Sequence, residues 1–168
     1  MQRPPDRRDG VTRALDGLRR LVRALRASAH SAERGVGLSG AQLFVLAELA
    51  AEPGASLSRL AERTSTDPSS VSVVVSRLVA RRLVARGRDP VDARRAALTL
   101  TSGGERLLAR APEPVQARLV AALRGLPGRE VRRLASNLGD IVAGMGLEGR
   151  TAEMFFEDQP PPRARRGR

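Results

Sequence analysis

The stretch "RGRDPVDARRAALTLTSGG", residues 86–104, predicts a β-hairpin and thereby decides the fold. Asp89 and Pro90 are typical of a turn, and "LVARGR" before them (residues 83–88) is a first candidate strand. After the turn, apolar residues alternate with others, which is the period of a half-buried strand. One face of this second strand carries Ala96, Leu98 and Leu100. We therefore expect two short strands joined by an arginine-rich tip.

Residues 68–82, before the hairpin, predict a helix with one buried face. Apolar residues recur there at i, i+3, i+4 and i+7: Val71, Val74, Val75 and Leu78. Asp67 before Pro68 is typical of a helix start, because Asp accepts backbone N–H groups there and Pro has no N–H that needs a partner. The valines alone favour a strand, which is the competing interpretation. The helix would expose a second face of small or cationic side chains: Ser69, Ser70, Ser72, Val73, Ser76 and Arg77.

Two helices are expected upstream of this one. "LSGAQLFVLAEL" (residues 38–49) starts with Ser39 and Gln42 at capping-box spacing, where each side chain can serve the other residue's backbone N–H. "SRLAERT" (residues 58–64) predicts a short helix. Helices followed by a hairpin form a winged helix-turn-helix, whose second helix enters the major groove of DNA. The predicted fold class is therefore mainly α with a small β wing.

Two outer helices carry apolar residues at alternating steps of three and four, which is typical of a helix that packs along another helix. The first runs from Val11 until "RGVG" (residues 34–37) ends it, and the last lies between Pro127 and about Gly144. The matched stripes suggest that these helices pair with each other in a dimer. The residues expected to do so are Leu15, Leu18, Val22, Leu134, Leu138 and Ile141.

Composition points to a polyanionic partner. The net charge is +12 and the isoelectric point is about 11.8, which favours nucleic acid first and an anionic membrane second. All 30 basic residues are Arg. With no Cys and one His, we expect no cofactor, no metal site and no enzyme, since no phosphate loop or paired-carboxylate motif is present. No apolar span or secretory signal is expected, so the chain is predicted to be cytoplasmic and to join the nucleoid when bound to DNA.

The sequence from Leu60 to Leu108 resembles the MarR-type transcriptional regulators almost from end to end, most specifically in Asp92-x-Arg94 followed by "LTLTSGG". The resemblance implies a homodimer whose first and last helices interlock, flanking the winged helix-turn-helix. It further implies that Arg94 reaches the minor groove and that Asp92 holds it by a charge-assisted hydrogen bond. The DNA-binding wing would comprise Arg88, Asp92, Arg94 and Arg95. One departure is Arg82, where relatives usually have Gly. If the left-handed turn of the relatives is kept, a residue other than Gly would cost about 1 kcal/mol there.

Each candidate contact has an alternative role. Ser69 and Ser70 could meet a phosphate at the helix start or merely cap it. Arg77 could bind guanine bidentately or be a solvated surface residue, and Val73 could contact a thymine methyl group or widen the buried stripe. Arg94 and Arg95 could instead form an ordinary charged hairpin tip. The resemblance also implies a small-molecule effector, with a candidate cleft at His30, Arg34 and Phe44; His30 could equally be structural or solvent-exposed.

These observations predict a sequence-specific regulator, expected to be a repressor, that binds a pseudo-palindromic operator as a homodimer. The alternative is a winged-helix protein that coats DNA without sequence preference or binds another protein; membrane binding is weaker because it conflicts with the dimer stripe. The expected organisation is a disordered N-terminus (1–10), a dimerisation helix (11–35), the DNA-binding domain (36–103), C-terminal dimerisation helices (104–146) and a flexible basic tail (147–168).

Overall fold

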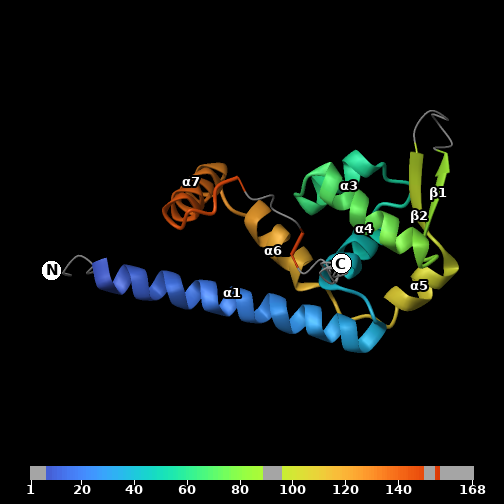
Figure 1. Ribbon diagram of the computed structural model, residues 1–168, viewed down its shortest axis with the longest axis horizontal. Helices are drawn as coiled ribbons and strands as arrows, with labels where there is room; N and C mark the ends of the chain where they lie inside the picture. Colours follow the sequence, from blue (N-terminus) through green and yellow to red (C-terminus); the bar gives the residue numbers. More distant parts are fainter. Residues whose placement is uncertain (1–6, 89–95, 150–153, 156–168) are drawn as a thin grey trace, which may run out of the picture.

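The computed structural model describes residues 7–88, 96–149 and 154–155. They form seven helices and one two-stranded sheet (Figure 1). In chain order the elements are α1 (Arg7–Val36), α2 (Gly40–Ala51), α3 (Leu57–Thr64), α4 (Pro68–Ala80), β1 (Val84–Arg88), β2 (Ala96–Leu100), α5 (Ser102–Leu108), α6 (Val115–Arg124) and α7 (Gly128–Gly144). The predicted fold class, mainly α with a small wing, is confirmed.

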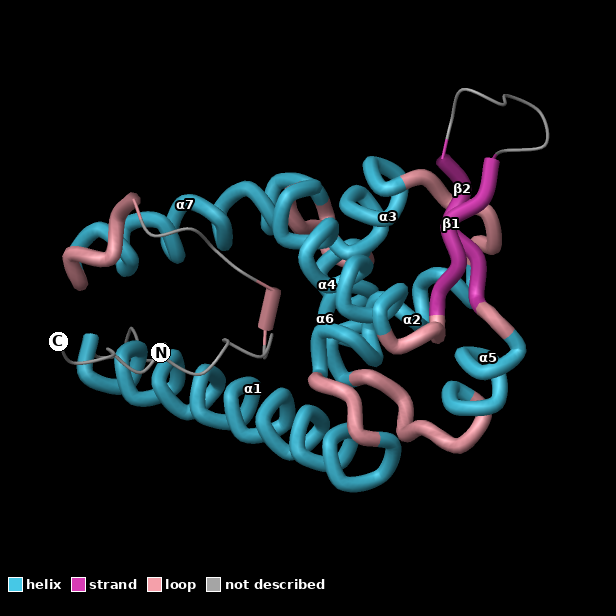
Figure 2. The backbone as a smooth tube through the Cα atoms, turned by 45° about the vertical axis from the view of Figure 1, so that its right-hand side comes forward, coloured by secondary structure: helices cyan, strands magenta, loops and turns pink. Residues whose placement is uncertain are grey.

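The helices fall into an inner and an outer group. Figure 2 shows α2, α3, α4, α5 and the hairpin gathered together, while α1 and α7 extend away from them and α6 lies between the two groups. We call the first group the inner unit. Within the described residues no helix is both long and apolar enough to cross a membrane.

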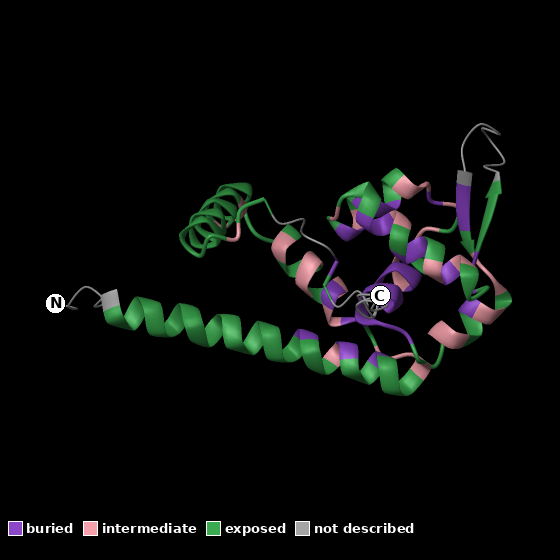
Figure 3. Ribbon diagram, in the orientation of Figure 1, coloured by how far each residue is buried: buried purple, intermediate pink, exposed green. Residues whose placement is uncertain are grey.

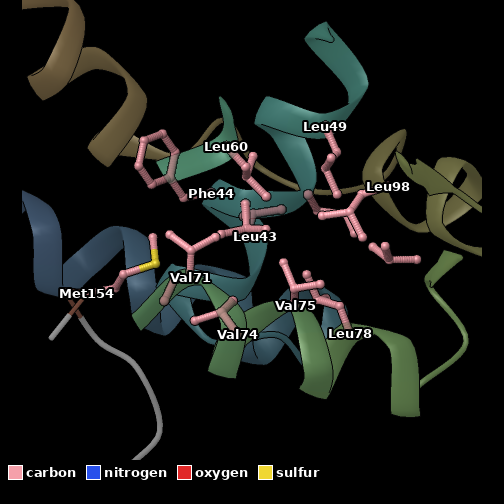
Figure 4. Packing of buried hydrophobic residues seen from close by; sticks show 14 of the residues in the cluster. Leu43, Phe44, Leu49, Leu60, Val71, Val74, Val75, Leu78, Leu98 and Met154 are labelled. Atoms are coloured by element: carbon pink, nitrogen blue, oxygen red, sulfur yellow. The ribbon is translucent and has the colours of Figure 1, made fainter. Parts of the chain in front are cut away.

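The core of the inner unit lies around α2, most of whose residues are buried. The four apolar residues predicted on one face of α4 are each 0% exposed: Val71, Val74, Val75 and Leu78. They pack towards Leu43 of α2 and Leu60 of α3 (Figure 4). The helix prediction for this valine-rich segment is thus confirmed and the strand alternative is wrong, because burial of this face outweighs the weak strand preference of Val.

Side-chain caps start α2 and α5, and the cap of α2 is the one that the sequence predicts. Ser39 Oγ accepts the backbone N–H of Gln42 at 3.2 Å, and Gln42 Oε1 accepts that of Ser39 at 3.3 Å, which completes the capping box. Thr101 Oγ1 accepts the N–H of Gly104 at 3.1 Å and begins α5. These caps satisfy backbone donors that a helix start otherwise leaves without a partner.

The hairpin is antiparallel, with its register running from Val84 opposite Leu100 to Arg88 opposite Ala96. It joins the inner unit through a bridge between Ala55 and Leu98. Gly104 follows the hairpin at a close approach, since a Cβ atom there would lie 2.2 Å from the carbonyl oxygen of Leu83. The "SGG" after the second strand therefore lets the start of α5 approach Leu83, in the turn between α4 and β1.

Two boundaries differ from the prediction. Helix α1 begins at Arg7, the first residue that the structure describes and four residues before the expected start at Val11. Met154, in the segment expected to be a flexible tail, is 6% exposed and belongs to the hydrophobic core. Its apolar side chain has a site to fill between α6 and the inner unit, which no local pattern could reveal.

Candidate nucleic-acid interface

The exposed face of α4 holds most of the residues predicted for it. Ser69, Val73 and Ser76 are exposed, and Ser72 and Arg77 are half-buried. Val73 is 46% exposed, so it does not widen the buried stripe of its helix. Ser70 is a correction, because it is only 6% exposed and lies at the edge of the buried face. The face available for contact is accordingly narrower at its start than predicted.

Asp67 occupies the donors at the start of α4. Its Oδ1 accepts the backbone N–H groups of Ser69 and Ser70, each at 3.0 Å, and its Oδ2 accepts the hydroxyl of Ser70 at 2.7 Å. The Ser69 hydroxyl also donates to Oδ1. The hydrogen bond from the Ser69 hydroxyl, followed by those from Ser70, holds the pKa of Asp67 well below its usual range.

This arrangement supports one of the two roles weighed for Ser69 and Ser70. Both residues cap the helix together with Asp67, and the donors that a phosphate would need are engaged by a carboxylate. A phosphate at this point would meet a negative charge rather than open N–H groups, although the helix dipole alone would attract it. The capping role is the one that the geometry supports.

Arg86, a residue that the sequence reasoning did not select, reaches the same face from the hairpin. Its Nη2 donates to Ser76 Oγ at 3.1 Å, so a guanidinium of β1 lies against the exposed side of α4. Arg86 is exposed. The signal that could have identified it is its place in "RGR", two residues before Arg88, since side chains two apart on a strand share a face.

The other predicted wing residues have no described side-chain geometry. Asp92, Arg94 and Arg95 lie outside the described residues, and Arg88 is placed only by its pairing with Ala96 at the end of the hairpin. Their predicted roles in DNA binding stay predictions.

Arg82 connects the exposed helix to the hairpin in a left-handed conformation, with φ +57°. Its N–H donates to Val79 O at 2.9 Å, and the N–H of Leu83 donates to Leu78 O at 3.0 Å, the pattern that commonly ends helices at a Gly. Thr101 Oγ1 donates to Arg82 O at 2.7 Å and fixes the turn from the other side. The left-handed turn is therefore kept at this position, although the residue is Arg and not Gly.

The residues predicted to form a ligand cleft are not brought together. His30 lies on a surface groove along α1 that includes Leu15, Leu18 and Val22. Arg34 is exposed and lines neither this groove nor the cavity at Phe44. Phe44 is buried, on a separate cavity of about 730 Å³. The sequence missed the remaining walls of that cavity: Thr64, Ser65, Thr66, Asp67, Gln116, Leu119, Val120, Leu123, Met154 and Phe155.

The cavity at Phe44 lies between α6 and the start of α4, and residues that follow α7 line part of it. Met154 contributes to its lining, and Gln116 Nε2 donates to the carbonyl oxygen of Phe155 at 2.8 Å. Over the described part of the chain, no three His, Cys, Asp or Glu side chains come together as a metal site would need.

Sequence similarity to known proteins covers part of the chain. A family model described as "MarR family" matches residues 36–95, which run from the end of α1 through β1 and stop just before β2. The HTH-type transcriptional repressor MdtR of Bacillus subtilis (strain 168) is 39% identical over 69 residues, which are 41% of this chain and 44% of that protein. The chain thus matches less than half the length of this curated relative.

Two solved structures are similar over most of the chain. The MarR family transcription regulator SP03579 has a TM-score of 0.56 and 22% identity, covering 84% of this chain and 95% of that one. The transcriptional regulator BldR from Sulfolobus solfataricus has a TM-score of 0.53 and 23% identity, covering 86% and 99%. At this identity the two likenesses show a shared fold.

Proposed function

We propose that this chain is a transcriptional regulator of the MarR family, whose model matches residues 36–95, and that it acts as a sequence-specific DNA-binding repressor, as the name of the similar protein MdtR suggests. It would act as a homodimer on a pseudo-palindromic operator, with half-sites about one helical turn apart. The chain's charge of +12 supports a polyanionic partner.

The observation that carries the proposal is the combined surface of α4 and Arg86. Small exposed side chains, Ser69 and Ser76, let a helix approach the base edges of the major groove, and Val73 is suited to the methyl group of thymine. Arg86 is held against Ser76 at 3.1 Å. A guanidinium fixed in this way can meet a phosphate or a guanine with less loss of side-chain freedom than a free one. Arg77, on α4 itself, adds a second cation to this surface.

Homodimer formation is supported by apolar surface that the chain leaves uncovered. On α1, Leu15, Leu18 and Val22 are exposed, and on α7 Leu138 and Ile141 are exposed as well. Leu134 of α7 is half-buried. Monomeric proteins rarely expose contiguous apolar patches of this kind. A second copy of the chain would cover both stripes by pairing the outer helices.

Regulation by a small molecule is supported by the cavity at Phe44. Its volume of about 730 Å³ falls in the range of about 300–1,000 Å³ for ligand sites. The cavity lies against Asp67, which caps the helix proposed to bind DNA. An apolar effector bound there would contact Met154 in the wall of the cavity.

The test is a DNA-binding titration at about 0.15 M salt. It compares a duplex from the region upstream of the protein's own gene with a shuffled duplex of equal length. A specific repressor should prefer its operator by at least about 10³-fold. Equal and weak affinity for both, with a steep loss as salt rises, would instead favour the non-specific alternative. Absence of binding to either duplex would favour the protein-binding alternative.

Two arginine variants test the proposed surface. Arg86→Gln should lower specific affinity about tenfold or more, because a good bidentate contact contributes about 1–3 kcal/mol. Arg106→Gln on α5 makes the same change of charge at another exposed site and should have a much smaller effect.

Arg94→Ala should weaken binding strongly and leave the dimer intact; unchanged affinity in that variant would remove the wing from the interface.

A further inference from the structure

Arg124, the last residue of α6, bonds to the turn that precedes α4. Its Nη2 lies 2.8 Å from the carbonyl oxygen of Glu62, 2.9 Å from that of Arg63 and 3.4 Å from Ser65 Oγ. These three residues are about 60 positions away in the sequence and form the end of α3. One guanidinium thus connects the outer part of the molecule to the helix-turn-helix.

The end of α3 has a physical need for such a partner. The last four carbonyl oxygens of a helix have no N–H donor within the helix, and they carry partial negative charge. A cation is therefore favourable there. The helix ends at Ser65 with φ +52°, a left-handed conformation that is strained for a residue other than Gly. Two residues later, Asp67 begins α4. The contacts of Arg124 therefore act on the short turn that sets the direction of α4.

The opposite end of α6 is attached to α1. The backbone N–H of Val115 donates to Ser28 Oγ at 3.2 Å. The two attachments are at the first and last of the ten residues of α6, a helix about 15 Å long. In Figure 1, α6 lies between α1 and the helix-turn-helix. A displacement of α1 that keeps the bond between Ser28 and Val115 would therefore either carry the turn before α4 with it or break the contacts of Arg124.

We propose that Arg124 is a positioning residue, which fixes α4 relative to α6 and α1 and so makes the spacing of the two DNA-binding helices in a dimer depend on the outer helices. The consequence for DNA rests on the proposed function, whereas the positioning itself does not. Arg124 is exposed, and its effect is exerted through backbone atoms rather than by contact with DNA.

The experiment compares Arg124→Gln with Arg118→Gln in the full-length protein. Both residues are exposed arginines of α6, so the two variants share the change of charge and the helix. Amide hydrogen exchange at Ser65 and Thr66, whose N–H groups donate to Glu62 O and Ala61 O, should become about tenfold faster in Arg124→Gln only. The amide of Leu46 in the core reports global opening and should not change.

DNA affinity provides the second readout. Specific affinity should fall about tenfold in Arg124→Gln beyond the fall in Arg118→Gln, and Arg124→Lys should recover part of it, since an ammonium can also donate to carbonyl groups. Equal exchange in the two Gln variants would overturn the positioning role, whatever happens to DNA binding. Faster exchange with unchanged specific affinity would overturn the connection to α4. If the wild type does not bind DNA selectively, the proposed function fails, while the exchange comparison still decides the role of Arg124.

Discussion

Helices α4 and α7 have the same kind of apolar pattern and opposite surroundings. In α4 the four stripe residues are 0% exposed, whereas no described residue of the 17-residue α7 is buried. Figure 3 shows the contrast, with buried residues concentrated in the inner unit and none among the residues of α7. A stripe at steps of three and four therefore identifies a face that needs a partner. It does not say whether that partner is in the same chain.

The most severe test of this comparison is Leu138→Asp on α7. Leu138 is 42% exposed in the single chain, but in a dimer the new carboxylate would be buried without a partner, which costs several kcal/mol. We expect the dimer dissociation constant to rise more than 100-fold in sedimentation equilibrium. Val73→Asp, at a similarly exposed residue of α4, should leave the dimer intact. A fully dimeric Leu138→Asp protein would refute the choice of interface.

Leu78→Ala tests the other side of the comparison, the stripe that is satisfied within the chain. Leu78 is completely buried among the residues of the core, so the free energy of unfolding should fall by about 2–5 kcal/mol. Urea denaturation measures this change. Val73→Ala on the exposed face of the same helix should stay within about 0.5 kcal/mol of the wild type. Equal losses in the two variants would contradict the assigned faces.

Arg82→Gly tests how α4 ends. The left-handed conformation of Arg82 (φ +57°) should cost about 1 kcal/mol relative to Gly, so this variant should be more stable than the wild type by up to that amount. Ala80→Gly, two residues earlier and still helical, should be less stable by about 1 kcal/mol. Thermal unfolding of both proteins is the measurement. Destabilisation by both substitutions would mean that the Arg82 side chain contributes more than its backbone costs.

The smallest expected effect concerns pH and the start of α4. The pKa of Asp67 is lowered in the folded state, first by the Ser69 hydroxyl and then by Ser70. A lowered pKa adds stability that is fully present above the unfolded value of about 3.9 and is lost as pH falls through the folded value. The difference in urea midpoint between wild type and Asp67→Ala should therefore be larger at pH 6 than at pH 2.5. Parallel pH curves for the two proteins would contradict this prediction.

Local signals were sufficient for the elements of the inner unit. The capping box at Ser39, the cap at Asp67 and the alternation around Leu98 each depend on residues within about four positions of one another. Such signals were readable because helix caps and strand faces are set by chain geometry at short range. The left-handed turn at Arg82 was predictable for the same reason, since the segment resembles relatives with Gly at that point.

Contacts between distant segments had no such signal. Arg81 Nη1 donates to Gly37 O at 2.5 Å across 44 positions, and Arg124 reaches Glu62 across 62. An arginine in a chain with 30 of them cannot be singled out by composition or periodicity. The candidate cleft failed likewise, because whether His30 and Phe44 share a cavity depends on how α1 and α2 pack. Ser70 was misplaced because it lies at the boundary between two faces, where a helical wheel discriminates least.

Met154 has a practical consequence for handling the protein. It lies nine residues after Met145, the C-cap of α7, yet it is a member of the core cluster that includes Phe44 and Val71. Shortening the chain after α7, a common choice when the last helix of a fold seems to mark its end, would remove a core side chain and enlarge the space beside the start of α4. A purification tag or reporter is therefore better fused at the N-terminus, on the side of the exposed α1, than close behind Met154.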